Sequence, residues 1–489
     1  MILWSAMKNL IIALVVGMVL LLSSPIYSQI TFERWYGGTE FDLGFSVIQT
    51  PDGGYTIAGC TNSFGSIGAD IYIIRTDAFG DTLWTKTYGG TGNDRARDII
   101  HTSEGGYAIV GYTESFGAGN EDVYLIEIDS IGDILWTKTY GGNNADIGYS
   151  LVESEQAGYV ISGSTESFGA GYEDIYVIKT DSLGDTIWTK TYGGSAADWG
   201  YSLVRNQNAE YVIAATSRSY GGKAYFLNLN TNGDTNWTNA VCYFDAKSID
   251  LTSDGGYIVA GDWQSFYAYI RLLKIDSFGD SIWAITDGVG NWRRGNSVIQ
   301  TSDLGYLVAG RVQYIGDNHC DVYLLKTDSL GQTIWTKHFG GINDYEDDIG
   351  QCIAKTIDGG FVVAGYTDTY GAGYFDVYLI KTDSLGNTGI EESEDSVELG
   401  IGNLKLKISP NPFNSEVRIQ ISEVGKKSNI APLSSDLSLH IYDSAGRLVN
   451  SIKLETNTYQ LGADLVPGVY FLKLTIGEHK ETQKLIKIR

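Results

Sequence analysis

The chain has 489 residues, and its 61 Gly, 33 Tyr and 11 Trp against 3 Met and 6 Pro favour many short aromatic-rich strands over helices. Its 34 Lys and Arg stand against 59 Asp and Glu, which gives a formal net charge of −25. Residues 29–390 hold 46 of these acids against 21 bases, a balance that excludes nucleic acid and anionic lipid as partners and favours cations or basic partners.

Residues 1–28 have the features of a secretory signal peptide. Lys8 precedes an uninterrupted apolar run from Leu10 to Leu22, and small or polar residues follow it up to Ser28. This run is shorter than the roughly 20 residues that a membrane-spanning helix needs. We therefore expect cleavage after Ser28, export by the Sec route into the periplasm, and no integral membrane segment after cleavage.

An internal repeat of about 52 residues occupies residues 29–390. A tryptophan returns at spacings of 52, 52, 49, 46 and 52 residues, at Trp84, Trp136, Trp188, Trp237, Trp283 and Trp335. Phe32 and Ile390 hold the equivalent places at the two ends. A turn that ends on an aromatic residue, such as Gly53-Gly54-Tyr55, also returns in every unit. Both series indicate seven units.

Each unit is predicted to form four short strands bounded by Gly, Asp or Asn turns. In the first unit these strands are residues 45–50, 55–61, 70–77 and 82–88. Four-stranded units repeated around an axis predict an all-β, seven-bladed β-propeller. Residues 30–36 align with the fourth strand of a unit, and the last unit lacks that strand. The N-terminal strand is therefore expected to complete blade seven and to remove the open edges.

The repeat resembles the glycine- and tryptophan-rich propeller repeats of secreted bacterial proteins, which implies the fold and little about function. The segment from Asp181 to Trp188 also resembles a sialidase Asp-box, but it carries an extra residue on each side. The vicinal cysteines of many quinoprotein propellers have no counterpart. The four cysteines lie far apart, and we expect buried thiols or one or two incidental disulfides. They are Cys60, Cys242, Cys320 and Cys352.

Residues 391–400 form an acidic linker, and residues 401–489 are predicted to form a small immunoglobulin-like β-sandwich with strands at 404–409 and 417–421. Four motifs occur there in order, with the marker residues Pro410, Asn411, Pro412, Phe413, Gly446, Pro467, Gly468, Tyr470 and Lys484. These motifs resemble the type IX secretion sorting domain (Por secretion tail, type A). The resemblance implies passage through the periplasm, recognition by the outer-membrane machinery, and release or attachment at the cell surface. The alternative is an ordinary accessory domain.

Two aspartate positions recur on the propeller face that carries the long loops. Before the innermost strand stand Asp42, Asp94, Asp146, Asp198 and Asp348, with Asp245 near the same place and Arg293 interrupting the series. At the end of the second loop stand Asp70, Asp122, Asp174, Asp321 and Asp376. A ring of carboxylates suits Ca²⁺, but a repeated loop aspartate more often accepts hydrogen bonds from its own turn. The structural role is favoured, and no other cofactor is expected.

Blades four to six depart most from the repeat and carry the candidate ligand residues Trp199, Trp263, Trp292, Arg293 and Arg294. Tryptophan beside polar groups suits stacking on sugar rings or a protein hot spot. The alternative is that these side chains fill gaps between blades.

The sequence shows no catalytic constellation. The histidines are His101, His319, His338, His440 and His479, and no two have metal-ligand spacing. The favoured function is a secreted or surface-displayed binding or scaffold propeller, monomeric, with a glycan or surface protein as ligand. The alternative is a polysaccharide-degrading glycoside hydrolase or lyase, which needs suitably placed carboxylates.

Overall fold

The computed structural model describes residues 30–388, apart from 156, 265–267, 289–290, 317–318 and 342–345, together with eight strands between residues 397 and 487 and residue 447. The chain separates into two compact units, Met1–Gly389 and Ile390–Arg489. All the described elements are β-strands, as predicted. Within these residues, no helix has the length and apolar character needed to cross a membrane. The predicted signal peptide, residues 1–28, lies outside the described residues.

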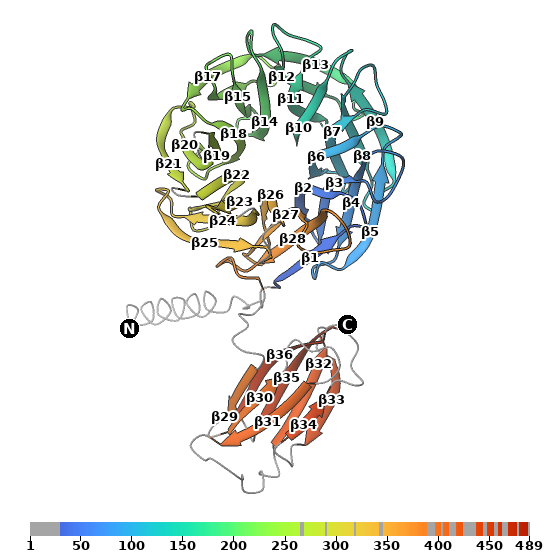
Figure 1. The fold of residues 1–489 in the computed structure, drawn as a ribbon, viewed down its shortest axis with the longest axis vertical. Coiled ribbons are helices and arrows are strands. Elements are labelled where there is room, and N and C mark those ends of the chain that lie inside the picture. The colour runs from blue at the N-terminus through green and yellow to red at the C-terminus, as the bar shows by residue number, and fades with distance from the viewer. Residues whose placement is uncertain are drawn as a thin grey trace, which may run out of the picture. The chain divides into compact units, whose positions relative to one another are not determined.

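Seven antiparallel four-stranded sheets surround one axis, which confirms the predicted seven-bladed propeller (Figure 1). Blade one consists, from the axis outward, of β2 (Asp42–Gln49), β3 (Tyr55–Thr61), β4 (Asp70–Thr76) and β5 (Thr82–Tyr88). Blades two to six repeat this order. Blade two consists of β6 (Asp94–His101), β7 (Tyr107–Thr113), β8 (Asp122–Ile128) and β9 (Ile134–Tyr140), and blade three of β10 (Asp146–Glu153), β11 (Tyr159–Thr165), β12 (Asp174–Thr180) and β13 (Thr186–Tyr192). Blade four consists of β14 (Asp198–Arg205), β15 (Tyr211–Ser217), β16 (Lys223–Leu229) and β17 (Thr235–Val241), blade five of β18 (Asp245–Leu251), β19 (Tyr257–Gln264), β20 (Ala268–Ile275) and β21 (Ser281–Asp287), and blade six of β22 (Asn291–Gln300), β23 (Tyr306–Tyr314), β24 (Asp321–Thr327) and β25 (Thr333–Phe339).

The N-terminal strand closes the ring, as the repeat alignment predicts. Blade seven contains β26 (Asp348–Lys355), β27 (Phe361–Thr367) and β28 (Asp376–Thr382), and its outer strand is β1 (Phe32–Tyr36). β1 pairs antiparallel with β28, with Phe32 opposite Lys381 and Tyr36 opposite Val377. β1, from the start of the chain, therefore forms the outer strand of the last blade, and its hydrogen bonds to β28 close the ring.

Three boundaries differ from the strands predicted for the first unit: β2 spans Asp42–Gln49 rather than residues 45–50, and β4 ends at Thr76 rather than at residue 77. Two of these differences come from aspartates. β2 begins at Asp42 rather than at residue 45, because the Asp42 side chain is buried under the loops instead of facing solvent. β4 ends at Thr76, because the Asp77 carboxylate accepts hydrogen bonds from the amides of Phe79 and Asp81 and so begins the turn.

One contact joins every blade to the next. Trp84 of the outer strand β5 packs on Gly132 of the third turn of blade two, where an added Cβ would lie 3.1 Å from the indole ring. The Tyr88 hydroxyl donates a hydrogen bond of 2.6 Å to the Gly132 carbonyl oxygen. The equivalent aromatic–glycine pairs complete the circle: Phe32–Gly80, Trp136–Gly184, Trp188–Gly233, Trp237–Gly279, Trp283–Gly331 and Trp335–Gly386. The repeated tryptophans, with Phe32 in blade seven, therefore form the packing contact between adjacent blades, here called the seam.

Leu304 occupies a left-handed backbone conformation that four other blades give to glycine and two to alanine. Its φ is +67°, whereas the equivalent Gly255 has φ +83°, and both amides close the same turn. The left-handed region costs a residue with a Cβ about 1–2 kcal/mol, while glycine adds about 0.5–1 kcal/mol of chain entropy to the unfolded state. We predict that Leu304→Gly raises the free energy of unfolding by about 0.5–1 kcal/mol, measured by urea denaturation. Gly255→Leu should lower it, and equal midpoints for both variants and the parent would contradict the argument.

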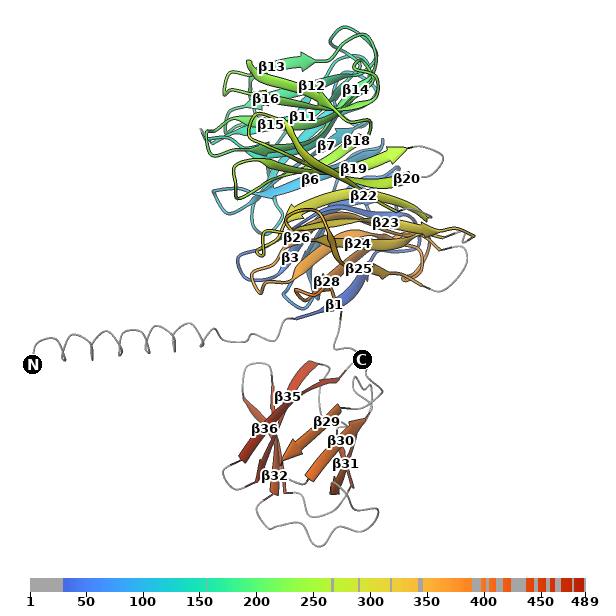
Figure 2. The ribbon, with the colours of Figure 1, turned by 90° about the vertical axis from the view of Figure 1, so that its left-hand side faces the viewer.

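The C-terminal unit contains two four-stranded antiparallel sheets. One is β29 (Val397–Ile401), β30 (Leu404–Ser409), β31 (Val417–Glu423) and β34 (Thr458–Leu461); the other is β33 (Leu448–Lys453), β32 (Leu437–Asp443), β35 (Gly468–Ile476) and β36 (His479–Lys487). Figure 2 shows them as separate groups of strands. Both strands predicted at 404–409 and 417–421 are present, and the immunoglobulin-like sandwich stays a prediction. Of the motif residues, Gly468 and Tyr470 lie in β35 and Lys484 in β36; Pro410, Asn411, Pro412, Phe413, Gly446 and Pro467 lie outside the described residues.

Candidate functional site

The aspartates at the start of the inner strands brace the loops between blades. In blade two, Asp94 Oδ2 accepts hydrogen bonds from the Gly90 amide at 2.8 Å and the Ser115 hydroxyl at 2.6 Å. Its backbone amide donates to the Ala69 carbonyl oxygen of blade one at 2.6 Å. A glycine amide and a serine or threonine hydroxyl bind the other members in the same way: Asp42, Asp146, Asp198 and Asp348. All five carboxylates are fully buried, so they do not line an open channel mouth.

The aspartates that end the second loop fold back on that loop. Asp122 Oδ2 accepts hydrogen bonds from the Ala118 and Gly119 amides at 2.7 and 3.1 Å. It faces Asp146 across Gly141, where an added Cβ would lie 2.0 Å from Asp122 Oδ1 and 2.7 Å from Asp146 Oδ2. Only glycine fits between the two carboxylates. Asp70, Asp174 and Asp376 bond their loops similarly, and at Gly340 the same close approach places Asp321 opposite Asp348.

These contacts are the backbone-capping role that the sequence favours. In the part of the chain that the structure describes, no group of three or more His, Cys, Asp or Glu side chains could hold a metal ion. Asp245 lies one position beyond the series, since it precedes Ala246 directly whereas Asp198 stands two residues before the equivalent Gly200. Calcium binding by the aspartates stays a prediction.

Among the propeller residues that the structure describes, the cysteines and His101 belong to no cluster of metal-ligating side chains. All four cysteines are free thiols, and burial raises the pKa of Cys60 and of Cys352 to about 11. Thiols with such pKa values are poor nucleophiles at neutral pH. His101 packs against Tyr107 with ring centroids 4.9 Å apart, and burial lowers its pKa. Cys60 and Cys320 are buried, whereas Cys242, Cys352 and His101 are half-buried.

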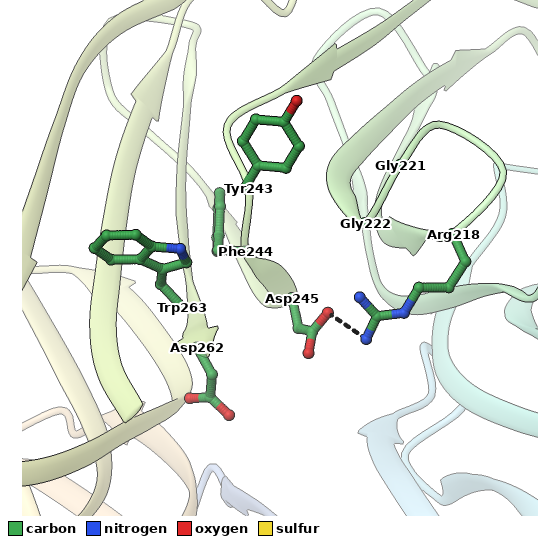
Figure 3. A pocket seen from close by; sticks show the side chains of 8 residues that line it. All are labelled: Arg218, Gly221, Gly222, Tyr243, Phe244, Asp245, Asp262 and Trp263. Carbon is green, nitrogen blue, oxygen red and sulfur yellow. Dashed lines mark ion pairs between the residues drawn. The ribbon is translucent and has the colours of Figure 1, made fainter. Parts of the chain in front are cut away.

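A pocket of about 210 Å³ opens at the junction of blades four and five (Figure 3). The loop after β15 spans residues 218–222, three fewer than the equivalent loop after β11, residues 166–173. The link between blades four and five is residues 242–244, two fewer than the link at 193–197 between blades three and four. The paired aspartates and their glycine are also missing there. The pocket therefore lies where shortened loops leave a junction uncovered.

Aromatic and charged side chains surround this pocket. Trp263 and Tyr243 are exposed over 39% and 64% of their surface. Arg218 and Asp245 face each other across the space and form an ion pair of 3.2 Å, as Figure 3 shows. The rest of the lining is Gly221, Gly222, Phe244 and Asp262.

The structure brings together only part of the predicted ligand residues. Trp263 lines the pocket, and Trp199 adjoins it because the Arg218 guanidinium lies 5.9 Å from the Trp199 ring. Trp292, Arg293 and Arg294 are not in the lining. Arg293 is largely buried, forms an ion pair of 2.6 Å with Asp287 and lies 4.7 Å from the Tyr323 ring centroid. Arg293 thus stabilises the junction of blades five and six instead of binding a ligand at this pocket.

A second cavity, of about 360 Å³, lies on the axis. Every inner strand has a β-bulge at the same place, between Gly44 and Ser46 in blade one. A bulge turns an extra side chain out of the ladder. The bulged residues of all seven blades line the cavity: Phe45, Arg97, Tyr149, Tyr201, Lys247, Asn296 and Gln351.

Sequence reasoning missed these seven residues, although one signal was present. The position before the bulge is always Gly or Ala and the position after it is Ser in five units, whereas the bulged residue itself varies widely. The residue after the bulge links blades: the Ser150 hydroxyl oxygen accepts from the Leu203 amide at 3.3 Å, and the Ser248 hydroxyl oxygen from the Val298 amide at 3.1 Å. The fold fixes the bulge and leaves its side chain free to serve a ligand.

Comparison with known families concerns the C-terminal unit. Residues 407–488 match the secretion system C-terminal sorting domain. The match confirms the predicted type IX sorting domain, and it implies that the secretion machinery engages this domain and carries the chain to the cell surface or the extracellular space.

Curated relatives match shorter stretches. The regulatory protein FlaEY of Caulobacter vibrioides is 22% identical over 32% of this chain and 20% of its own length. Karilysin of Tannerella forsythia is 27% identical over 31% of this chain and 34% of its own length. The chain thus spans about a third or less of these relatives.

Solved structures share low sequence identity with the chain. PorZ, a surface component of the type IX secretion system of Porphyromonas gingivalis, is 14% identical, with 91% of this chain and 59% of PorZ covered and a TM-score of 0.41. The WD40 domain of Neurospora crassa Pan2 is 11% identical, with 73% and 92% covered and a TM-score of 0.45.

Proposed function

We propose that this exported propeller is a carbohydrate-binding module and that the pocket between blades four and five holds a neutral sugar. The observation that carries the proposal is the pair of exposed rings, Trp263 and Tyr243, beside the Arg218–Asp245 ion pair. At the equivalent junctions between blades one and four, longer loops occupy this space.

The chemistry of this pocket matches that of a sugar. The apolar C–H face of a pyranose stacks on an aromatic ring, and the polar end of Trp or Tyr stays in water. Arg218 supplies hydrogen-bond donors and Asp245 acceptors, which together can bind neighbouring hydroxyls. The volume of about 210 Å³ is below the range of drug-sized pockets and suits one ring. Because the propeller segment holds 46 acids against 21 bases, its field disfavours acidic glycans at this surface.

Trp263→Ala is expected to weaken glycan binding at least tenfold, because it removes the stacking platform. Trp35→Ala is the matched control: Trp35 is exposed over 47% of its surface and lies in β1, outside the pocket lining. A glycan array selects the ligand, and isothermal titration calorimetry measures the affinity of both variants. Equal affinity for Trp263→Ala and the parent would contradict this site. Release of reducing ends from the bound glycan would contradict a binding function and favour a hydrolase.

A further inference from the structure

We propose that the central channel is a second, independent binding site, for a small carboxylate-bearing saccharide of the uronic acid type, and that Arg97 binds its carboxylate. The site is the cavity of about 360 Å³ lined by the seven bulged residues. This volume lies within the range of small-ligand pockets, about 300–1,000 Å³, and suits a mono- or disaccharide.

Arg97 forms no direct ion pair within the described part of the chain, and the acid that feels its charge is Glu121, whose pKa burial raises and Arg97 lowers. The Arg97 guanidinium lies 4.9 Å from the Phe45 ring centroid and 5.7 Å from that of Tyr112. Among the residues that the structure describes, no carboxylate is within ion-pair distance of it, and its buried Nε has no hydrogen-bond partner. An arginine held by aromatic rings presents a planar fork that matches a carboxylate.

The charge of the cavity lining opposes that of the rest of the propeller. None of the seven lining residues is acidic, although the propeller segment has more than two acids for each base. Lys247 is already paired with Asp262 at 3.0 Å, so Arg97 is the cation left to bind a ligand. Asp98 follows Arg97 in the strand, but its oxygens already accept hydrogen bonds from the Ser46 and Ser150 hydroxyls and from two backbone amides.

The other lining residues suit hydroxyl groups and a ring. Tyr149 and Tyr201 lie side by side with centroids 5.1 Å apart, and burial raises both pKa values, so both phenols stay protonated and can donate. Asn296 donates one N–H to the Gly350 carbonyl oxygen at 2.9 Å and Gln351 one N–H to the Tyr366 hydroxyl at 3.4 Å, so each amide keeps its oxygen and one further N–H for a ligand. One cation among several neutral hydrogen-bonding groups and aromatic faces fits a sugar that carries a single carboxylate. A polyanion would require more cations.

The experiment is calorimetric titration of the exported protein with galacturonate, glucuronate, mannuronate and their disaccharides, with galactose, glucose and mannose as neutral partners. We expect at least one uronate to bind at least tenfold more tightly than its neutral counterpart, with an affinity that falls as salt is raised. Absence of binding by every uronate, or equal affinity for a uronate and its neutral sugar, would overturn the proposal.

Arg97→Gln should weaken uronate binding at least tenfold, because it removes a charge-assisted bidentate contact. Arg34→Gln is the control, since Arg34 is exposed on the outer strand and lies 3.9 Å from Asp81. If Arg97→Gln does not fold, Gln351→Glu is tested instead, because the negative charge it adds to the cavity lining should repel the uronate and weaken its binding. Unchanged affinity in the folded variant overturns the proposal. Trp263→Ala should leave uronate binding intact, which separates this site from the pocket between blades four and five.

Discussion

Removal of residues 399–489 is expected to abolish release of the propeller from the cell. Residues 407–488 carry the sorting-domain match, and they belong to the unit Ile390–Arg489, separate from the propeller. The propeller makes its own closed ring from residues 32–382 and does not need the tail to fold. The truncated chain should therefore accumulate in the periplasm, with at least a tenfold fall in the extracellular and surface fractions, measured by immunoblotting of cell fractions.

The control is the folded state of the truncated propeller. Its thermal unfolding midpoint should equal that of the propeller in the full-length chain, which excludes misfolding as the cause of retention. A truncated propeller recovered outside the cell in normal amounts would show that residues 399–489 are an accessory domain and that export uses another signal.

Phe32→Ala is expected to destabilise the propeller by about 3–5 kcal/mol, the usual cost of truncating a buried phenylalanine. Phe32 in the closing strand β1 is 8% exposed, packs against Gly80 and lies 5.9 Å from the Tyr55 ring. In blade seven, Phe32 makes the contact with a glycine of the next blade that a tryptophan makes in each of the other blades. The loss weakens the seam between blades seven and one, where the ring closes. Urea denaturation followed by tryptophan fluorescence measures the change.

Phe278→Ala is the matched control for this substitution. Phe278 lies in the third turn of blade five and is exposed over 72% of its surface. Its truncation should change the free energy of unfolding by no more than about 0.5 kcal/mol. If the two variants unfold at the same urea concentration, the contact of β1 with blade one does not hold the ring together.

The blade count and the closure could be predicted from the sequence because each depends on a contact repeated in every unit. Trp84 and its equivalents must all meet the same glycine of the next blade, so their spacing reports the blade directly. The structural role of Asp94 and its equivalents was favoured for the same reason. A residue type that returns at the same position in nearly every blade is explained by the fold that the blades share.

The candidate sites could be predicted only in part, because they depend on departures from the repeat. The spacings of 49 and 46 residues indicated lost loop residues, and Trp263 was identified as a ligand residue on that basis. The same reasoning groups Arg293 with it, whereas the structure pairs Arg293 with Asp287, an interaction that a repeat alignment does not reveal. The bulge that turns Arg97 into the channel is marked in the sequence only by a small residue before it and, in five units, a serine after it, and these residues do not reveal where the bulged side chain points.

The pairing of β1 with β28 also sets an order of events during biogenesis. Phe32 belongs to the first strand of the ring and Lys381 to the last strand to be made, yet they are partners. A chain that crosses the inner membrane with its N-terminus first holds β1 unpaired until almost the entire propeller has followed. Strand pairs between distant parts of a chain form slowly, and the unpaired strand edges stay exposed until they form. On the predicted Sec route, the interval between emergence of β1 and arrival of β28 is therefore when we expect periplasmic chaperones and proteases to have access to this chain.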